Sequence, residues 1–269
     1  MKPLSVMRVA GAALLALLLG ACATPSGSGT TRSAASSGDS ARARNARVHL
    51  ELAEGYYQRG QGEVALGEVD KALQLSPDYV AAYNMKGLIE MGLGHERRAD
   101  ADFRQALSLA PDNGDTLHNY GWFLCSQGRY AESFTQFARA LKVHGYRSAE
   151  RTDLAYGVCQ LRAGDVTGAE HTLRRGFALD PANPAMATNL ALALHRQHRD
   201  RDALFYIARV NDAATANAQS LWLGVLIARR LGDAQRQAAW TAQLTQRFPN
   251  SQEAIAVQQG HFDDPGLLR

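Results

Sequence analysis

The apolar residues between positions 46 and 260 lie at helical spacing, three or four residues apart. No stretch of this region alternates apolar and polar residues as a half-buried strand does. Alanine, leucine, glutamine and arginine are abundant, and all four favour helices. The pattern therefore predicts an all-α protein built from short helices.

Small residues and prolines divide this pattern into units of 34 residues. Glycine recurs at positions 60, 94, 128, 164 and 232, small residues recur at 65, 99, 133, 169 and 203, and prolines stand at 77, 111, 181 and 249. Such a unit is typical of the tetratricopeptide repeat (TPR), a helix–turn–helix motif. We expect six repeats, starting at 46, 80, 114, 150, 184 and 218, that stack into a right-handed solenoid. The turn 143–149 is two residues longer than the others.

Each recurring residue type has a structural reason within this motif. Gly121 and its equivalents are expected where two helices cross, because a missing side chain lets the backbones approach. Gly128 and its equivalents are expected just past each first helix, in the left-handed conformation that ends a helix. Pro77 and its equivalents separate the repeats, and the residues beside them are expected to cap the next helix. The sixth repeat fits less well, because Val225 and Gln237 occupy positions that are usually small.

In such solenoids the first helices line a concave face, which usually binds peptides or other proteins. The second, fifth, ninth and twelfth positions of each unit are expected to point there, and most of them are apolar. An apolar groove suits an amphipathic or β-prone segment of a partner protein. The candidate binding residues are Leu50, Tyr57, Leu88, Met91, Trp122 and Leu154. The alternative is that these side chains only pack between repeats, since helical spacing serves both purposes.

The same positions in the later repeats are less uniform. Val158 and Leu161 share the face of Leu154, on a helix that we expect to be buried throughout. Trp222 and Arg229 occupy these positions in the sixth repeat. The Lys and Asn clamp with which chaperone-binding members of the superfamily grip a terminal carboxylate is missing.

The N-terminus resembles the signal of a bacterial lipoprotein. Lys2 and Arg8 accompany an apolar run that is too short to span a bilayer, and small residues lead up to Cys22. The resemblance implies cleavage after residue 21 and acylation of Cys22, which would anchor the chain to a membrane. Ala23 stands where lipoproteins retained in the inner membrane carry Asp, so we expect the periplasmic face of the outer membrane. An ordinary secretory signal is the alternative.

Four segments follow from these features. Residues 1–21 form the signal peptide. Residues 22–45 form the lipidated cysteine and a flexible tether, because Ser, Thr, Gly and Ala dominate there and bury too little apolar surface to order the chain. Residues 46–260 form the repeat solenoid, with a short capping helix over 251–259. Residues 261–269 form a loose C-terminal tail.

The charge of the chain argues against one class of partner. Removal of the signal peptide leaves 27 basic and 26 acidic residues, a net charge of +1, and no block of Lys and Arg stands out. Binding to a phosphate backbone requires clustered positive charge. We therefore expect no nucleic-acid partner.

A short run in the third repeat resembles one particular family. The run reads Asn119-Tyr120-Gly121-Trp122-Phe123-Leu124-Cys125, and Gly128-Arg129-Tyr130 follows it. Together with the Cys22 signal and the six repeats, it resembles the type IV pilus biogenesis and stability lipoproteins, the PilF/PilW pilotins. The resemblance implies an outer-membrane lipoprotein that binds the type IV pilus secretin and supports its localisation and multimer assembly, and hence pilus biogenesis and twitching motility. The alternatives are a general periplasmic scaffold that recruits peptidoglycan hydrolases and a factor of outer-membrane protein assembly.

Two cysteines remain once Cys22 is acylated. Cys125 and Cys159 are 34 residues apart on the first helices of adjacent repeats. The periplasm is oxidising, so we expect a disulfide between repeats three and four. Their positions within the unit differ by two, which could stretch the Cα separation beyond the limit of about 7 Å. Two buried thiols are the alternative.

No set of residues with the spacing of a catalytic site is found. His195 and His198, with Asp200 and Asp202 nearby, are the best candidates for metal ligands, but nothing completes the ligand set. We expect these histidines and Arg201 to form a solvated turn. No Gly-rich phosphate loop or nucleophile elbow occurs. The sequence thus predicts a protein without enzymatic activity, metal, cofactor or small-molecule substrate.

Replacement of Cys22 tests the expected lipid anchor, because serine cannot carry the thioether-linked lipid. We expect Cys22→Ser protein to move from the membrane fraction to the soluble periplasm and to leave its partner mislocalised. Fractionation and immunoblotting measure the shift, with Ser26→Ala as a control in the same segment. Unchanged recovery of the Cys22→Ser protein in the outer membrane would contradict the anchor.

Overall fold

The computed structural model describes residues 30–263 and residue 267. The chain divides into two compact units, residues 1–41 and residues 42–269, and the repeats lie in the second unit. Every regular element of the described residues is helical, which confirms the predicted all-α fold. The signal peptide, Cys22 and Ala23 lie outside the described residues. None of the described helices has the length and apolar character needed to cross a bilayer.

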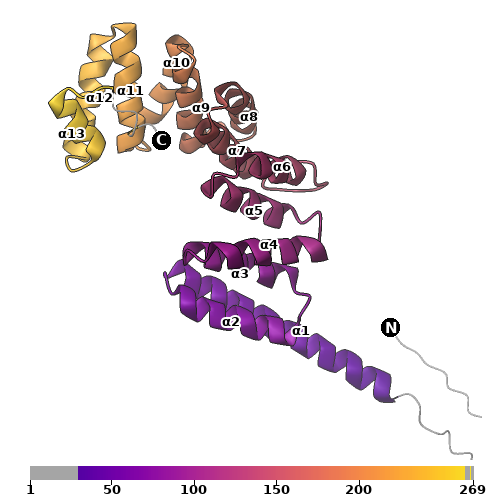
Figure 1. The fold of residues 1–269 in the computed structure, drawn as a ribbon. Coiled ribbons are helices and arrows are strands. Elements are labelled where there is room, and N and C mark those ends of the chain that lie inside the picture. The colour runs from indigo at the N-terminus through magenta and orange to yellow at the C-terminus, as the bar shows by residue number, and fades with distance from the viewer. Residues whose placement is uncertain (1–29, 264–266, 268–269) are drawn as a thin grey trace, which may run out of the picture. The chain divides into compact units, whose positions relative to one another are not determined.

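The helices follow one another as pairs joined by short turns, in chain order (Figure 1). Their bounds are α1 Thr30–Gln58, α2 Gly62–Leu75, α3 Val80–Gly92, α4 Glu96–Leu109, α5 Gly114–Ser126, α6 Tyr130–Ala140, α7 Ala149–Ala163, α8 Val166–Leu179, α9 Pro184–Arg196, α10 Asp200–Asn211, α11 Ala218–Leu231, α12 Ala234–Arg247 and α13 Gln252–Gln259. The last of these is the expected capping helix.

Contacts between neighbours hold the second unit together. Each helix packs against the next one along the chain, from α2 to α13. The first helices of adjacent repeats also touch, α3 with α5, α5 with α7, α7 with α9 and α9 with α11. This is the contact pattern of a TPR solenoid, in which each repeat is stabilised by the repeats beside it.

Within a repeat, a glycine on the first helix accepts a bulky side chain from the second. A Cβ atom at Gly121 would lie 2.9 Å from the ring of Phe137, and one at Gly157 would lie 2.4 Å from Leu173. Both distances are shorter than van der Waals contact, so a larger residue would push the two helices apart. The structure thus confirms that this glycine marks the helix crossing.

The sixth repeat makes the same contact one residue earlier than expected. Gly224, rather than Val225, faces the second helix, and a Cβ atom there would lie 2.7 Å from the ring of Trp240. Val225 is buried on a neighbouring face of α11. The poor fit of Val225 to the repeat pattern therefore reflects a shift in register, and α11 and α12 form a sixth helix pair.

The third repeat shows how a polar residue fits the small-residue position of the second helix. Ala65 and its equivalents have no exposed surface, and Ser133 takes this place on α6. The Ser133 hydroxyl donates a hydrogen bond to the Gly121 carbonyl at 2.7 Å, which satisfies the buried oxygen. The bond ties the second helix to the first at their crossing.

Some helix ends have the capping residue that the sequence predicts, and one does not. Gly128 has a φ of 71°, the left-handed conformation expected after a first helix. Asn113 caps α5, because its Oδ1 accepts a hydrogen bond from the Thr116 amide at 2.9 Å. The cap expected beside Pro77 is absent, since α3 begins after Tyr79 without a side-chain hydrogen bond.

The prediction of a flexible coil for the tether is wrong for its second part, which belongs to helix α1. The helix begins at Thr30 and ends at Gln58, so residues 30–45 are helical. Alanine and arginine are frequent in this stretch, and both favour helices. Once the first repeat has formed a helical turn, extension adds one hydrogen bond per residue and needs no apolar burial.

A charged hollow of about 240 Å³ between α2, α3 and α4 contains a perturbed carboxyl group. Burial raises the pKa of Asp102 to about 6, although Lys86 opposes the shift and Glu90 and Asp70 add to it. The folded chain therefore holds this proton more tightly than the unfolded chain does. Above pH 6 the Asp102 carboxylate is charged and destabilises the fold.

We expect Asp102→Asn to raise the free energy of unfolding at pH 7.5 by about 1 kcal/mol, a value that allows for solvent screening of a partly exposed group. The gain should shrink as the pH falls from 6 toward 4 and disappear well below the ordinary pKa of 3.8, where the carboxyl is neutral in both states. Urea unfolding followed by circular dichroism measures the difference, with exposed Asp78→Asn as the control. A gain that is independent of pH would contradict the assignment.

Candidate protein-interaction groove

The six predicted binding residues lie on successive first helices. Leu50 and Tyr57 belong to α1, Leu88 and Met91 to α3, Trp122 to α5 and Leu154 to α7. Five of them are half-buried, and the four on α1, α3 and α5 form what we call the apolar strip, which consists of Tyr57, Leu88, Met91 and Trp122. Tyr57 of α1 contacts Leu88 of α3, and α3 touches α5, so the strip runs from one repeat to the next.

Side-chain contacts link the first part of the apolar strip. The Tyr57 hydroxyl donates a hydrogen bond to the Leu88 carbonyl at 3.3 Å. Leu88 packs against the apolar core of the first two repeats and against a second core between α4 and α5, and Met91 packs against this second core. Their remaining exposed surface is therefore held in place by the repeats and is available to a partner.

Two predicted residues contribute more to the core than to the surface. Leu50 is only 6% exposed and belongs to the core of the first repeats. Leu154 is half-buried and packs against the core of the C-terminal repeats. For Leu50, packing in the core explains the apolar character that the sequence shows, whereas a contact of Leu154 with a partner stays a prediction.

Trp122 contacts an arginine that lines a hollow beside the apolar strip. The guanidinium of Arg162, from α7, lies 5.0 Å from the centre of the Trp122 ring, a cation–π contact. Next to it, a hollow of about 470 Å³ lies between the ends of α7 and α9. We call it the arginine hollow; it is lined by Val158, Leu161, Arg162, Asn189, Leu192 and Arg196, among others.

Sequence reasoning found only the apolar half of the arginine hollow. Val158 and Leu161 were placed on this face, although we expected them to be buried, and Val158 is half-buried. Arg162 and Arg196 were missed, because they fall outside the four positions assigned to the concave face. Their spacing of 34 residues, shared with Arg230, is the signal that could have identified them.

The C-terminal tail covers the last repeat, which corrects the expectation of a loose tail for its described residues. The rings of Phe262 and Trp222 stack with centroids 6.0 Å apart, and the Arg229 guanidinium lies 4.2 Å from the centre of the Phe262 ring. Leu267 also packs against the C-terminal core. Trp222 has no exposed surface as a result, so this end of the face does not offer an open groove.

The two candidate disulfide cysteines lie close together at the junction of repeats three and four. The Sγ atoms of Cys125 and Cys159 are 2.20 Å apart and the Cα atoms are 5.9 Å apart. The Cα separation is within the range for a disulfide, so the offset of two positions does not prevent pairing. Both side chains are buried beside Phe137.

At the end of α9, His195 is not part of a solvated turn, contrary to the expectation. His195 and Asp200 are both 5% exposed, and His195 Nδ1 lies 2.5 Å from Asp200 Oδ1. Arg230 also contacts Asp200, at 3.2 Å. His198 and Arg201 are exposed, as expected, and His198 lies in the left-handed region with a φ of 60°. Among the described residues, no group of three His, Cys, Asp or Glu side chains could hold a metal ion.

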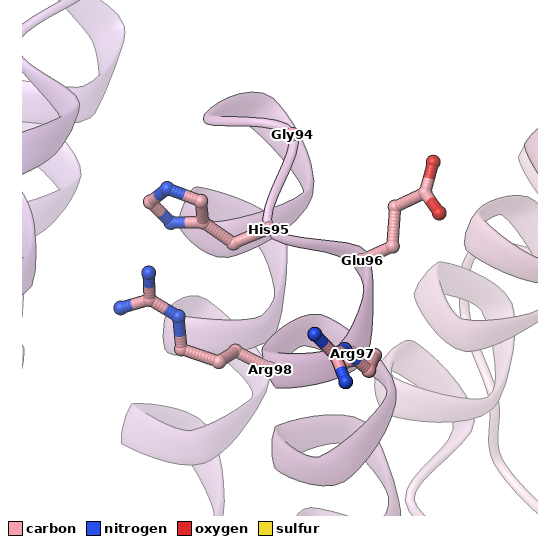
Figure 2. A pocket seen from close by; sticks show the side chains of 5 residues that line it. All are labelled: Gly94, His95, Glu96, Arg97 and Arg98. Carbon is pink, nitrogen blue, oxygen red and sulfur yellow. The ribbon is translucent and has the colours of Figure 1, made fainter.

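A further hollow, of about 500 Å³, lies at the turn between α3 and α4 (Figure 2). Figure 2 shows His95 and Arg98 on one side of this turn and Glu96 on the other. His95 pairs with buried Glu90 at 2.6 Å, and Arg98 lies 3.5 Å from the same carboxylate. These contacts make the charged side chains part of the turn, so the hollow is a poor candidate for a binding site.

Comparison with known proteins identifies the class of this chain. Models of the tetratricopeptide repeat match residues 80–113 and 103–135. The type IV pilus assembly protein PilF of Pseudomonas aeruginosa is 28% identical over 211 residues, which cover 78% of this chain and 83% of PilF. The solved structure of P. aeruginosa PilF covers 82% of this chain and 99% of its own at 26% identity, with a TM-score of 0.73.

A second solved structure is that of PilW, a widely conserved type IV pilus biogenesis factor. It is 32% identical to this chain, covers 79% of it and 98% of its own length, and has a TM-score of 0.73. The protein is thus a TPR protein of the class that binds other proteins. It belongs to the PilF/PilW family of type IV pilus biogenesis proteins, as the run from Asn119 to Cys125 predicted.

We expect Cys125 and Cys159 to form a disulfide in the exported protein. Thiol labelling of the denatured, unreduced chain, with the Cys22→Ser variant used to remove the third cysteine, should then find no reactive thiol. Replacement of both by alanine should lower the free energy of unfolding by about 3 kcal/mol and abolish the effect of a reductant on it. Two labelled thiols in the unreduced chain would contradict the disulfide.

Proposed function

We propose that this protein is a pilotin: a lipoprotein of the outer membrane that binds the type IV pilus secretin and supports its localisation and assembly into multimers. Pilus biogenesis and twitching motility then depend on it. The observation that supports this proposal most strongly is the apolar strip, which offers part-exposed apolar side chains on the first three repeats of a PilF/PilW family member.

The strip suits an amphipathic or β-prone segment of the secretin. Tyr57, Leu88 and Met91 project from two adjacent first helices, so one bound segment can contact all three. Each apolar side chain that such a segment buries contributes about 1.5–3 kcal/mol. Since the repeats already hold these side chains in place, little conformational entropy is lost when the partner binds.

Acylated Cys22 would place the binding face at the membrane where the secretin assembles. The residues between Cys22 and the first repeat would separate the binding face from the membrane surface. Ala23 supports sorting to the outer membrane. A disulfide between Cys125 and Cys159 would link the third and fourth repeats covalently and limit their movement relative to each other.

Charged substitution in the apolar strip tests the proposal. We expect Leu88→Glu and Met91→Glu each to weaken secretin binding at least tenfold, because a carboxylate cannot be buried in an apolar contact without a partner. Co-purification from solubilised envelopes, followed by titration with the purified secretin, measures the loss. Leu179→Glu is the matched control, since Leu179 lies on the second helix α8 and is 58% exposed. Leu50 is unsuitable, because its burial would make a charge there unfold the first repeat.

Circular dichroism of each variant separates lost binding from lost folding. Full-strength secretin binding by folded Leu88→Glu and Met91→Glu would move the site away from the strip. If the wild-type chain co-purifies with peptidoglycan hydrolases instead of the secretin, and deletion leaves twitching intact, the pilotin proposal is wrong and the scaffold alternative takes its place.

A further inference from the structure

The sixth repeat has a binding face that its own chain occupies. Trp222, Leu226 and Arg229 are the fifth, ninth and twelfth residues of the unit that starts at 218, which are positions of the concave face. They lie on α11 four and three residues apart, so their side chains share one side of the helix, which we call the sixth-repeat face. Phe262, which follows α13, lies on this face.

The contacts of Phe262 show which side chain the sixth-repeat face accepts. The rings of Phe262 and Trp222 are nearly parallel, with an interplanar angle of 4° and centroids 6.0 Å apart. The guanidinium of Arg229 lies 4.2 Å from the centre of the Phe262 ring, which is a cation–π contact. An aromatic ring therefore fits against both an indole and a guanidinium group at this place.

One polar group of the sixth-repeat face is left without a partner. Trp222 has no exposed surface, and its indole Nε1–H has no hydrogen-bond acceptor in the described part of the chain. Trp240, the other buried tryptophan of this repeat, donates its Nε1–H to Asp212 Oδ1 at 3.3 Å. Burial of a donor without an acceptor costs free energy comparable to what a ring stack contributes. Phe262 thus satisfies the aromatic part of the face but not its polar part.

The path of the backbone allows Phe262 to leave the face. Helix α13 ends at Gln259, and Gly260 follows it in the left-handed conformation with a φ of 73°. The cap extends to His261, whose amide donates to the Ala256 carbonyl at 2.9 Å. Phe262 comes directly after this cap and is half-buried. A change in the backbone dihedral angles of Phe262 therefore moves its ring without breaking a hydrogen bond of α13.

We propose that the sixth-repeat face is a second docking site, which binds an extended, aromatic-containing segment of a partner protein, and that Phe262 closes this site in the free protein. The aromatic ring of the partner takes the place of the Phe262 ring against Trp222 and Arg229. A backbone carbonyl of the partner accepts the hydrogen bond from Trp222 Nε1–H, which the Phe262 ring cannot accept. An extended segment has such carbonyls available, because no helix uses them.

Peptide display against the immobilised full chain tests the site, and it needs no secretin. The wild-type chain and Phe262→Ala each select from a library of random peptides. We expect Phe262→Ala to enrich peptides that contain Phe, Tyr or Trp, and the wild type to enrich them much less. Ile255→Ala is the matched control, because it removes another apolar side chain near the C-terminus, 43% exposed on α13, and should select as the wild type does.

Fluorescence anisotropy with the most enriched peptide gives the magnitude. We expect this peptide to bind Phe262→Ala about tenfold more tightly than the wild type, because a site that is open in only about one tenth of the molecules binds about tenfold more weakly. Addition of Arg229→Gln to Phe262→Ala should weaken binding about threefold, through loss of the cation–π contact.

Proton NMR of the indole N–H groups tests the proposed hydrogen bond. The Trp222 Nε1–H resonance should move downfield when the peptide is added to Phe262→Ala, because it gains an acceptor. The Trp240 resonance is the internal control, since that N–H is already bonded to Asp212. The wild-type chain should show the same shift at high peptide concentration, so the test does not depend on the folding of Phe262→Ala.

Several results would overturn the proposal. Folded Phe262→Ala, checked by circular dichroism, would select no aromatic peptides, or the enriched peptide would bind it no more tightly than the wild type. A Trp222 resonance that does not move at saturating peptide would place the binding elsewhere. Dimerisation of Phe262→Ala in sedimentation, without peptide binding, would show that a second copy of the chain takes the face instead.

Discussion

The distance between the two helices of a repeat is set by a bulky side chain that enters a glycine notch. Gly121 with Phe137 and Gly157 with Leu173 leave no room for a Cβ atom. The same notch recurs in four of the six repeats, while Ala53 and Ala191 replace the glycine in the first and the fifth, and the first helices touch from α3 to α11. The continuity of the binding face depends on this repetition, since a partner segment must meet one first helix after another.

The face produced in this way has three parts with different chemistry. The apolar strip lies on the first three repeats, the arginine hollow lies on the fourth and fifth, and the tail covers the sixth. Phe262 stacks on Trp222 and covers it. The last repeat is thus closed by its own chain, whereas the apolar strip on the earlier repeats keeps part of its surface exposed.

Much of the fold could be predicted because its determinants are local and periodic. The glycine, alanine and proline positions identify the helix pairs, and the run from Asn119 to Cys125 identifies the family. The features that were missed depend on contacts outside the repeat pattern. Stacking of Phe262 on Trp222 and the burial of His195 beside Asp200 require distances that spacing alone does not supply. The arginines of the hollow were missed for a different reason, because only four positions of each unit were assigned to the face.

The central claim of the proposed function is that the apolar strip contacts the secretin. In-cell photo-crosslinking tests it most directly, with a photoreactive amino acid at position 91 in one strain and at position 179 in another. Met91 lies in the strip, whereas Leu179 lies on α8 and is 58% exposed. The account predicts a secretin adduct from position 91 and none from position 179. Adducts from position 91 that lack the secretin, or a secretin adduct from position 179 alone, would contradict it.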